Sequence, residues 1–206
     1  MIYTLIGSRE TPPEVLTLMT KFAYKAALQG YKVRSGGADG SDTCAEIGVL
    51  QYLKDYNQYS KVAEDLMEIY LPWKDFNGRN SNDYGYYTLP FMGNRFQAED
   101  IAKEIHPKWK LEGRIKRGEV EKPKNWEPMS QGAKKLHTRN IYQVLGKDLA
   151  TPSRFILCYG ESEKKGSPIA KGGTRSACVL GQQHNVEIFN LYLQEHLERV
   201  KDWVGG

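Results

Sequence analysis

The chain has 206 residues, 40% of them hydrophobic, and a formal net charge of +4. This length suffices for one well-buried core, so we expect a single domain spanning residues 1–206. No apolar run approaches the roughly 18 residues that cross a bilayer, and the apolar start Met1–Ile6 is far shorter than a leader. We therefore expect neither a membrane-spanning segment nor a signal peptide, and no membrane partner.

The cysteines and the charged residues narrow the class further. Three cysteines without Cys-x-x-Cys spacing and four scattered histidines argue against a disulfide framework or a metal site, and favour the reducing cytoplasm. Between Lys108 and Arg139, ten Lys or Arg face four Glu, an excess of +6 that leaves about −2 elsewhere. This imbalance favours a polyanionic partner or a solvated basic insertion, which we place around residues 80–130.

In chain order, short apolar runs alternate with segments of helical spacing. Strands are predicted at Ile2–Ile6, Tyr31–Arg34, Met67–Leu71, Arg154–Tyr159 and Val186–Phe189. Helices are predicted from Pro12 to Gly30 and at Asp42–Tyr56, Phe96–Ile105, Gln131–Leu145, Gly173–Gln183 and Leu191–Trp203. The stretch Lys74–Leu89 shows no period, and no element is expected there. Alternating buried strands and helices predict an α/β fold, a Rossmann-like three-layer sandwich with a mainly parallel sheet of about five or more strands.

The stretch Ser35–Asp42 has three glycines in five positions and lies between the second strand and the second helix. Glycine lets backbone N–H groups approach a ligand closely, and a helix N-terminus adds free donors and a positive dipole end. The stretch therefore favours binding a phosphate or pyrophosphate, although a plain strand-to-helix turn with a Ser or Asp cap also explains it. Its candidate ligand residues are Ser35, Gly36, Gly37, Ala38, Asp39, Gly40 and Asp42.

Other candidate ligand residues follow predicted strands or lie in a later helix. Gly7, Ser8 and Arg9 end the first strand, where an arginine can grip phosphate with two hydrogen bonds or lie on the surface. Gly172, Gly173 and Thr174 open a helix, where Thr174 is either a ligand residue or only an N-cap. Arg139 and Asn140 lie in a helix, and Trp73 either stacks on a base or closes the core. Loops after parallel strands share one edge of a sheet, so we expect one shared cradle.

The ordered set of these motifs resembles the SLOG superfamily. The motifs are Gly7-Ser8-Arg9, Ser35–Asp42 with Ala45-Glu46, Arg139-Asn140 and Gly172-Gly173-Thr174. The resemblance is nearest to its YspA/YpsA-like group and to phage-encoded proteins labelled DprA-like. It runs from Ile2 to Leu191, with Asn80–Ser130 the most divergent part. It implies a Rossmann-like fold that binds nucleotides or derivatives such as ADP-ribose and NAD, and a homodimer, in the host cytoplasm if the protein is phage-encoded.

The resemblance leaves three functions open. The first is capture of a nucleotide or ADP-ribose-like ligand without turnover, which in a phage could sequester a defence signal; no other cofactor is expected. The second is N-glycosidic hydrolysis. Related phosphoribohydrolases carry a catalytic Glu where this chain has Ala177, so the remaining carboxylates are Glu46, Asp39 and Asp42. For these carboxylates, binding a ribose hydroxyl or capping a helix is favoured over catalysis. The third is single-stranded DNA binding by the basic insertion, with Trp109 and Trp126 either as stacking platforms or as anchors of the insertion to the core.

Overall fold

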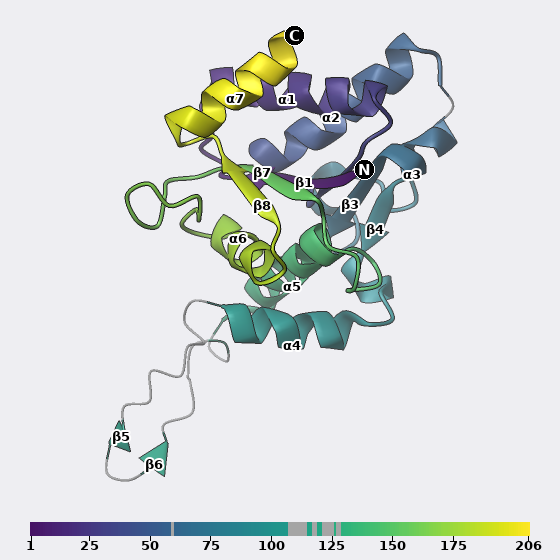
Figure 1. The fold of residues 1–206 in the computed structure, drawn as a ribbon. Coiled ribbons are helices and arrows are strands. Elements are labelled where there is room, and N and C mark those ends of the chain that lie inside the picture. Colours follow the sequence, from purple (N-terminus) through teal and green to yellow (C-terminus); the bar gives the residue numbers. More distant parts are fainter. Residues whose placement is uncertain (59, 107–114, 117–118, 121–125, 127–128) are drawn as a thin grey trace.

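The computed structural model describes residues 1–58, 60–106, 115–116, 119–120, 126 and 129–206 (Figure 1). Six strands form the main sheet: β1 (Ile2–Gly7), β2 (Lys32–Ser35), β3 (Met67–Leu71), β4 (Tyr86–Thr88), β7 (Phe155–Tyr159) and β8 (Glu187–Asn190). The helices are α1 (Pro13–Leu28), α2 (Ser41–Asp55), α3 (Ala63–Leu66), α4 (Arg95–Ile105), α5 (Gln131–Leu145), α6 (Thr174–Gln183) and α7 (Gln194–Gly205). Short 3-10 turns lie at Ser60–Val62, Phe76–Gly78 and Leu89–Phe91, and β5 (Ile115–Lys116) pairs with β6 (Glu119–Val120).

The main sheet is parallel throughout, in the order β4-β3-β2-β1-β7-β8. The chain adds strands outward from β1 to β4 and then returns to the other side of β1 with β7. The order therefore reverses between β1 and β7, which is where open α/β sheets bind ligands. The arrangement confirms the predicted Rossmann-like α/β class.

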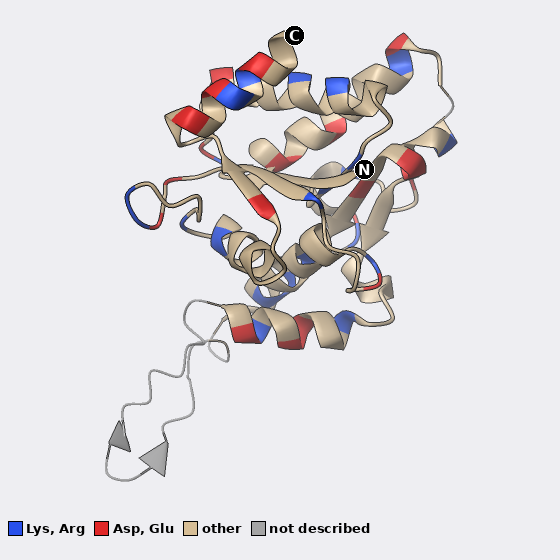
Figure 2. Cartoon of the chain, in the orientation of Figure 1, with Lys and Arg blue, Asp and Glu red and all other residues tan. Residues whose placement is uncertain are grey.

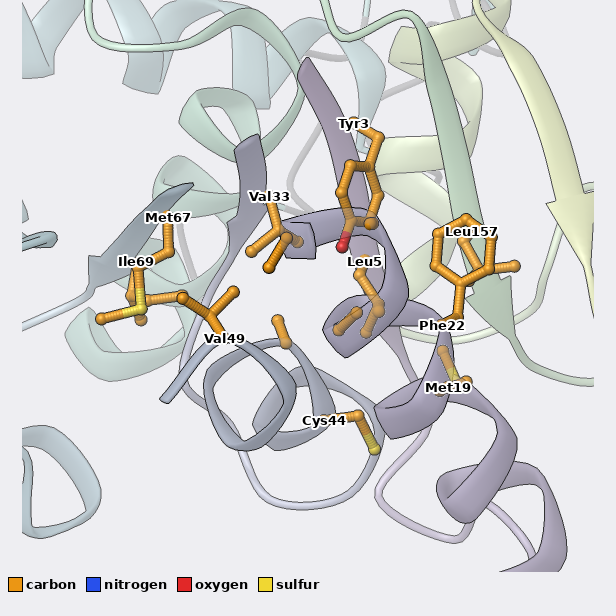
Figure 3. Packing of buried hydrophobic residues seen from close by; sticks show 14 of the residues in the cluster. Tyr3, Leu5, Met19, Phe22, Val33, Cys44, Val49, Met67, Ile69 and Leu157 are labelled. Atoms are coloured by element: carbon orange, nitrogen blue, oxygen red, sulfur yellow. The ribbon is translucent and has the colours of Figure 1, made fainter. Parts of the chain in front are cut away.

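Helices cover both faces of the sheet. In Figure 1, α1, α2 and α7 lie on one face, α5 and α6 lie on the other, and α4 packs on α5 and α6 as an outer layer. Successive residues of a strand point to opposite faces, and β1 supplies both cores: Tyr3 and Leu5 pack beneath α1, whereas Ile6 packs beneath α5. Figure 3 shows the first of these clusters around Leu5 and Phe22. Burial on both faces explains the nearly continuous apolar runs of the strands.

The outer surfaces of the helices carry mixed charge. Figure 2 shows acidic and basic residues interspersed along α1, α4 and α7. Among the described residues, none of the helices combines the length and the apolar character that crossing a bilayer requires.

The expectation of no element in Lys74–Leu89 is wrong, because β4 lies there. Its three residues pair in parallel with β3, from Ile69 opposite Tyr86 to Leu71 opposite Thr88. So short a strand has too few residues to display a period, and it forms because β3 offers an unpaired edge. Much of the expected basic insertion, including Trp109, lies outside the described residues. Trp126 is 1% exposed and belongs to a core cluster, so of its two predicted roles the anchor in the core is supported and the stacking platform is wrong.

Candidate functional site

A cavity of about 480 Å³ lies at the carboxyl edge of the sheet, beside the reversal of strand order. The end of β1, one face of α5 and the loop leading into α6 form its walls. Its volume is within the range of about 300–1,000 Å³ that small-molecule sites occupy. The lining residues are Ile6, Gly7, Ser8, Arg9, Glu10, Ala38, Asp42, Ala133, Leu136, His137, Arg139, Asn140, Gln143, Lys171, Gly172, Gly173 and Thr174.

The end of β1 is anchored by backbone hydrogen bonds. The Ser8 N–H donates to the Tyr159 carbonyl (2.9 Å), and the Ser8 carbonyl accepts from the Ser41 N–H (3.3 Å). A β-carbon at Gly7 would lie 2.5 Å from the Ser41 hydroxyl, so only glycine fits at this junction of β1 with α2. The backbone is thereby fixed, while the side chain of Arg9 is exposed at the cavity.

The loop before α6 forms an open corner, which we define as Gly172–Thr174. A β-carbon at Gly172 or Gly173 would meet no atom within 4 Å. Gly172 has φ +71°, a left-handed conformation that favours glycine. α6 begins at Thr174, and the first turn of a helix leaves N–H groups without intrahelical partners. Lys171 also lines the cavity, with its ammonium paired to Glu161.

The floor of the cavity is a buried ion pair. Arg139 Nη1 donates to Asp42 Oδ2 (3.1 Å), and the other carboxylate oxygen of Asp42 accepts from the Gly7 N–H (3.2 Å). Their exposures are only 6% and 3%. Burial raises the pKa of Asp42, with Arg139 opposing the shift, and burial lowers the pKa of Arg139, with Asp42 opposing it. The pair thus sits where charge is costly and each partner stabilises the other.

Amide side chains of α5 extend the floor toward the open corner. With its amide turned so that both ends are satisfied, Gln143 accepts from the Gly36 N–H (2.8 Å) and donates to Asn140 Oδ1 (3.1 Å). Asn140 in turn donates to the Gly173 carbonyl (3.1 Å). A chain of hydrogen bonds therefore joins Gly36, directly after β2, to the open corner across the cavity.

A neutral histidine borders the same floor. His137 packs edge-on against His106, with ring centroids 4.6 Å apart at 89°. Burial, with a further contribution from His106, lowers the pKa of His137 to about 4. At neutral pH it therefore presents an uncharged ring to the cavity.

The glycine pair Gly36–Gly37, which we call the closed corner, is filled by the protein's own side chains. A β-carbon at Gly36 would lie 1.3 Å from Arg139 Nη1, and one at Gly37 would lie 2.8 Å from Arg79 Nε. Arg79 is held by Glu46, with Nε 2.6 Å from Oε1 and Nη2 2.6 Å from Oε2. Burial raises the pKa of Glu46, although Arg79 opposes the shift. At this corner, the space that the glycines leave is occupied by the side chains of Arg139 and Arg79, and not by a ligand.

The structure brings together ten of the sequence-predicted site residues in the cavity lining: Gly7, Ser8, Arg9, Ala38, Asp42, Arg139, Asn140, Gly172, Gly173 and Thr174. Seven others do not line this cavity: Ser35, Gly36, Gly37, Asp39, Gly40, Glu46 and Trp73. Ser35 donates to the Leu5 carbonyl (2.6 Å), and Trp73 packs edge-on against Phe76 with ring centroids 4.9 Å apart.

Sequence reasoning missed several lining residues of α5. The cavity-lining face of α5 has residues at helical spacing on both sides of the predicted Asn140. The missed residues are Ala133, Leu136, His137 and Gln143. Residues three and four apart share a helix face, so extending that spacing from Asn140 would have found them. Lys171 is adjacent to the predicted Gly172 and could have been included for its charge.

The lining combines positively charged and apolar groups, with one exposed carboxylate at Glu10. Arg9, Lys171 and the start of α6 supply positive charge, whereas Leu136 and Ala133 supply apolar surface. Of the three candidate catalytic carboxylates, Asp42 alone lines this cavity, and both of its oxygens are engaged. Asp42 is therefore engaged, whereas Glu10 also lines the cavity with an exposed carboxylate for which the described residues show no ion pair.

No family model matches the chain, and no curated protein matches it. A solved structure described for the single-stranded DNA binding mode of DNA processing protein A from Helicobacter pylori is similar to it. The match has 14% sequence identity and a TM-score of 0.38, and covers 100% of this chain and 79% of that one. At these values the likeness supports no argument about function, and membership of the SLOG superfamily stays a prediction.

Proposed function

We propose that the cavity binds a nucleotide or an ADP-ribose-like molecule and holds it without turnover. The observation that carries this proposal is the open corner Gly172–Thr174, at the reversal of strand order, in a cavity that Arg9 and Lys171 also line. Free N–H groups of a helix N-terminus and a guanidinium both suit phosphate oxygens. In a phage-encoded protein, such binding would sequester a signalling nucleotide of the host's defence.

Binding without turnover is favoured because the candidate acids are engaged or remote from the cavity. Glu46 is paired with Arg79, and Asp42 accepts hydrogen bonds from Arg139 and Gly7. A carboxylate that attacks a sugar or activates water needs access to the ligand. Chromatography of ADP-ribose, NAD and nucleoside monophosphates after incubation should therefore show unchanged compounds. Conversion that the Asp42→Asn or the Glu10→Gln variant abolishes would instead support the hydrolase.

Isothermal titration tests the binding itself. We expect ADP-ribose, NAD or ADP to bind, and adenosine, which lacks phosphate, to bind at least tenfold more weakly. Arg9→Gln should weaken the phosphorylated ligands about tenfold or more, since a hydrogen bond to a charged group contributes about 1.5–3 kcal/mol. Lys54→Gln removes an exposed positive charge on α2 and serves as the matched control. Absence of heat with every ligand, or equal losses in both variants, would contradict the proposal.

A second candidate function, single-stranded nucleic acid binding, is favoured by a different surface. Phe91 and Phe96 are 80% and 64% exposed, and the guanidinium of Arg95 lies 4.5 Å from the ring centroid of Phe96. A basic cavity of about 260 Å³ between α4 and α5 adjoins them and includes Arg95 and Lys135 in its lining. Exposed aromatic rings beside cations suit stacked bases and phosphates.

A labelled oligonucleotide tests this candidate. Binding should weaken steeply as salt rises, and the double variant Phe91→Ala/Phe96→Ala should lose about tenfold or more in affinity, at about 1–3 kcal/mol per stacked base. Both rings are exposed, so the fold should tolerate the change. Tyr56→Ala removes another half-exposed ring, on the far side of the sheet, and is the control.

The expected single domain and homodimer stay proposals, and light scattering after size-exclusion chromatography tests the dimer.

A further inference from the structure

A second cavity, of about 410 Å³, lies at the opposite edge of the sheet from the first. Its lining comes from Met1 and Tyr31, just before β1 and β2, from the first residues of β7 and β8, and from α1 and α7. The two helices lie together on one face of the sheet (Figure 1). The lining residues are Met1, Phe22, Tyr31, Arg154, Phe155, Leu157, Glu187, Phe189, Arg199, Val200 and Trp203. No residue belongs to both cavities.

The walls of this second cavity are aromatic. Phe189 contacts Phe155 edge-on (centroids 5.8 Å apart), Phe155 contacts Phe22 (6.1 Å), and Phe22 contacts Trp203 (4.5 Å). Four rings, from the strands β7 and β8 and the helices α1 and α7, therefore form one continuous aromatic wall. Tyr3 stacks on one face of Phe155, Arg199 lies over Phe189 and Lys25 lies over Trp203. The wall therefore offers the edges and the remaining faces of these rings to a flat ring system.

The rim of the cavity is positively charged. Arg154 is exposed, and no side-chain partner is recorded for its guanidinium among the described residues. Arg199 lies over the ring of Phe189 (4.7 Å) and pairs with Glu187 (3.3 Å). Two guanidinium groups and one carboxylate leave a net charge of +1. Aromatic rings can bind a cationic ligand, but the positive charge of this rim disfavours one. A carboxylate on the ligand, in contrast, can pair with Arg154.

We propose that this cavity is a second ligand site, specific for a flat aromatic molecule that carries a carboxylate. The ring lies against Phe155, Phe189 and Trp203, and the carboxylate faces Arg154. The site is independent of the nucleotide cavity, because the two lie at opposite edges of the sheet and share no residue.

The probe is 2-naphthoate, and its neutral counterpart is 2-naphthamide. Titration is followed by NMR through the indole N–H of Trp203, which the Trp203→Phe variant identifies. We expect 2-naphthoate to shift this resonance and 2-naphthamide to bind about fivefold more weakly. Arg154→Gln should lower the affinity for 2-naphthoate by up to about fivefold, the upper range for an exposed ion pair, and leave 2-naphthamide unchanged. Lys54→Gln should change neither.

Three outcomes would overturn the proposal. The first is no shift of the Trp203 resonance at millimolar 2-naphthoate. The second is equal affinity for acid and amide in the unsubstituted protein, which would indicate a nonspecific apolar surface. The third is displacement of 2-naphthoate by ADP-ribose, which would place it in the first cavity. Because Arg154 is exposed, Arg154→Gln should fold normally, and its urea denaturation midpoint checks this.

Discussion

Two glycine pairs with the same sequence signature have opposite surroundings. At the closed corner, a β-carbon on Gly36 would meet Arg139 at 1.3 Å, whereas at the open corner a β-carbon on Gly173 would meet nothing within 4 Å. A glycine pair between a strand and the next helix thus permits close approach to the backbone, without indicating which group approaches. At the first pair the partners are two arginines of the same chain. At the second the neighbouring space is open, which is why the proposed ligand is assigned there.

The largest expected effect is a difference in protein stability between a substitution at the closed corner and one at the open corner. Gly36→Ala should lower the free energy of unfolding by about 3–5 kcal/mol, because the new methyl group displaces Arg139 and leaves Asp42 buried without its partner. Gly173→Ala should change it by less than about 0.5 kcal/mol, since the methyl group meets no atom. Urea denaturation measures both. Similar losses in the two variants would mean that the corners do not differ as described.

A double-mutant cycle on Asp42 and Arg139 sharpens the assignment of the closed corner. Asp42→Asn and Arg139→Met should each destabilise the fold, and the double variant should lose about 2–3 kcal/mol less than the sum of the two, as expected for residues in direct contact. Asn at position 42 can still accept from the Gly7 N–H, so the cycle isolates the ion pair. Additive losses, measured by urea denaturation, would refute a stabilising pair.

The floor between the corners should respond to pH through His137. Its pKa is lowered to about 4 in the folded state, against about 6.5 when unfolded, so the unfolded chain binds the proton first as pH falls. Stability is therefore unaffected above about pH 7 and declines between pH 6.5 and 4, by about 2 kcal/mol at pH 5. The measurement compares urea denaturation of the protein and of His137→Gln at pH 7.5 and 5. An equal decline in both would contradict this origin.

The smallest effect belongs to the mouth of the open corner. Lys171 is paired with the half-exposed Glu161, and an exposed pair contributes about 0–1 kcal/mol. Glu161→Gln should leave the denaturation midpoint nearly unchanged and tighten binding of ADP-ribose about twofold, by removing a negative charge beside the lysine. Glu195→Gln, in the first turn of α7, is the control. Weaker binding in Glu161→Gln would argue that Lys171 does not face the ligand.

Most of the fold could be predicted because the local sequence pattern of each main strand and helix indicates that element. Strands β1, β3 and β7 are apolar runs buried on both faces, and α1 and α5 show helical spacing with clear ends. β4 could not be predicted, because its three residues depend on pairing with β3 rather than on their own pattern.

The site was predictable in part. Turn glycines and polar residues at strand ends identified Gly7–Arg9 and Gly172–Thr174 from sequence alone. The occupants of the closed corner were not identifiable, because Arg79 lies 33 residues beyond its partner Glu46 and Arg139 lies 97 beyond Asp42. Contacts at such separation depend on how the whole chain folds and leave no local signal.

Helix α5 is fixed at both ends. Ser130 caps its start by accepting from the Ala133 N–H (3.2 Å). At its end, the buried Arg34 pairs with Glu68 and donates to the carbonyl of Val144 (3.4 Å) and to that of Thr151 in the following loop (2.5 Å). These contacts oppose sliding or rotation of α5 when a new ligand binds. A change of ligand preference in such a protein would therefore come from exchanging side chains one helical turn apart on α5, with the backbone left in place.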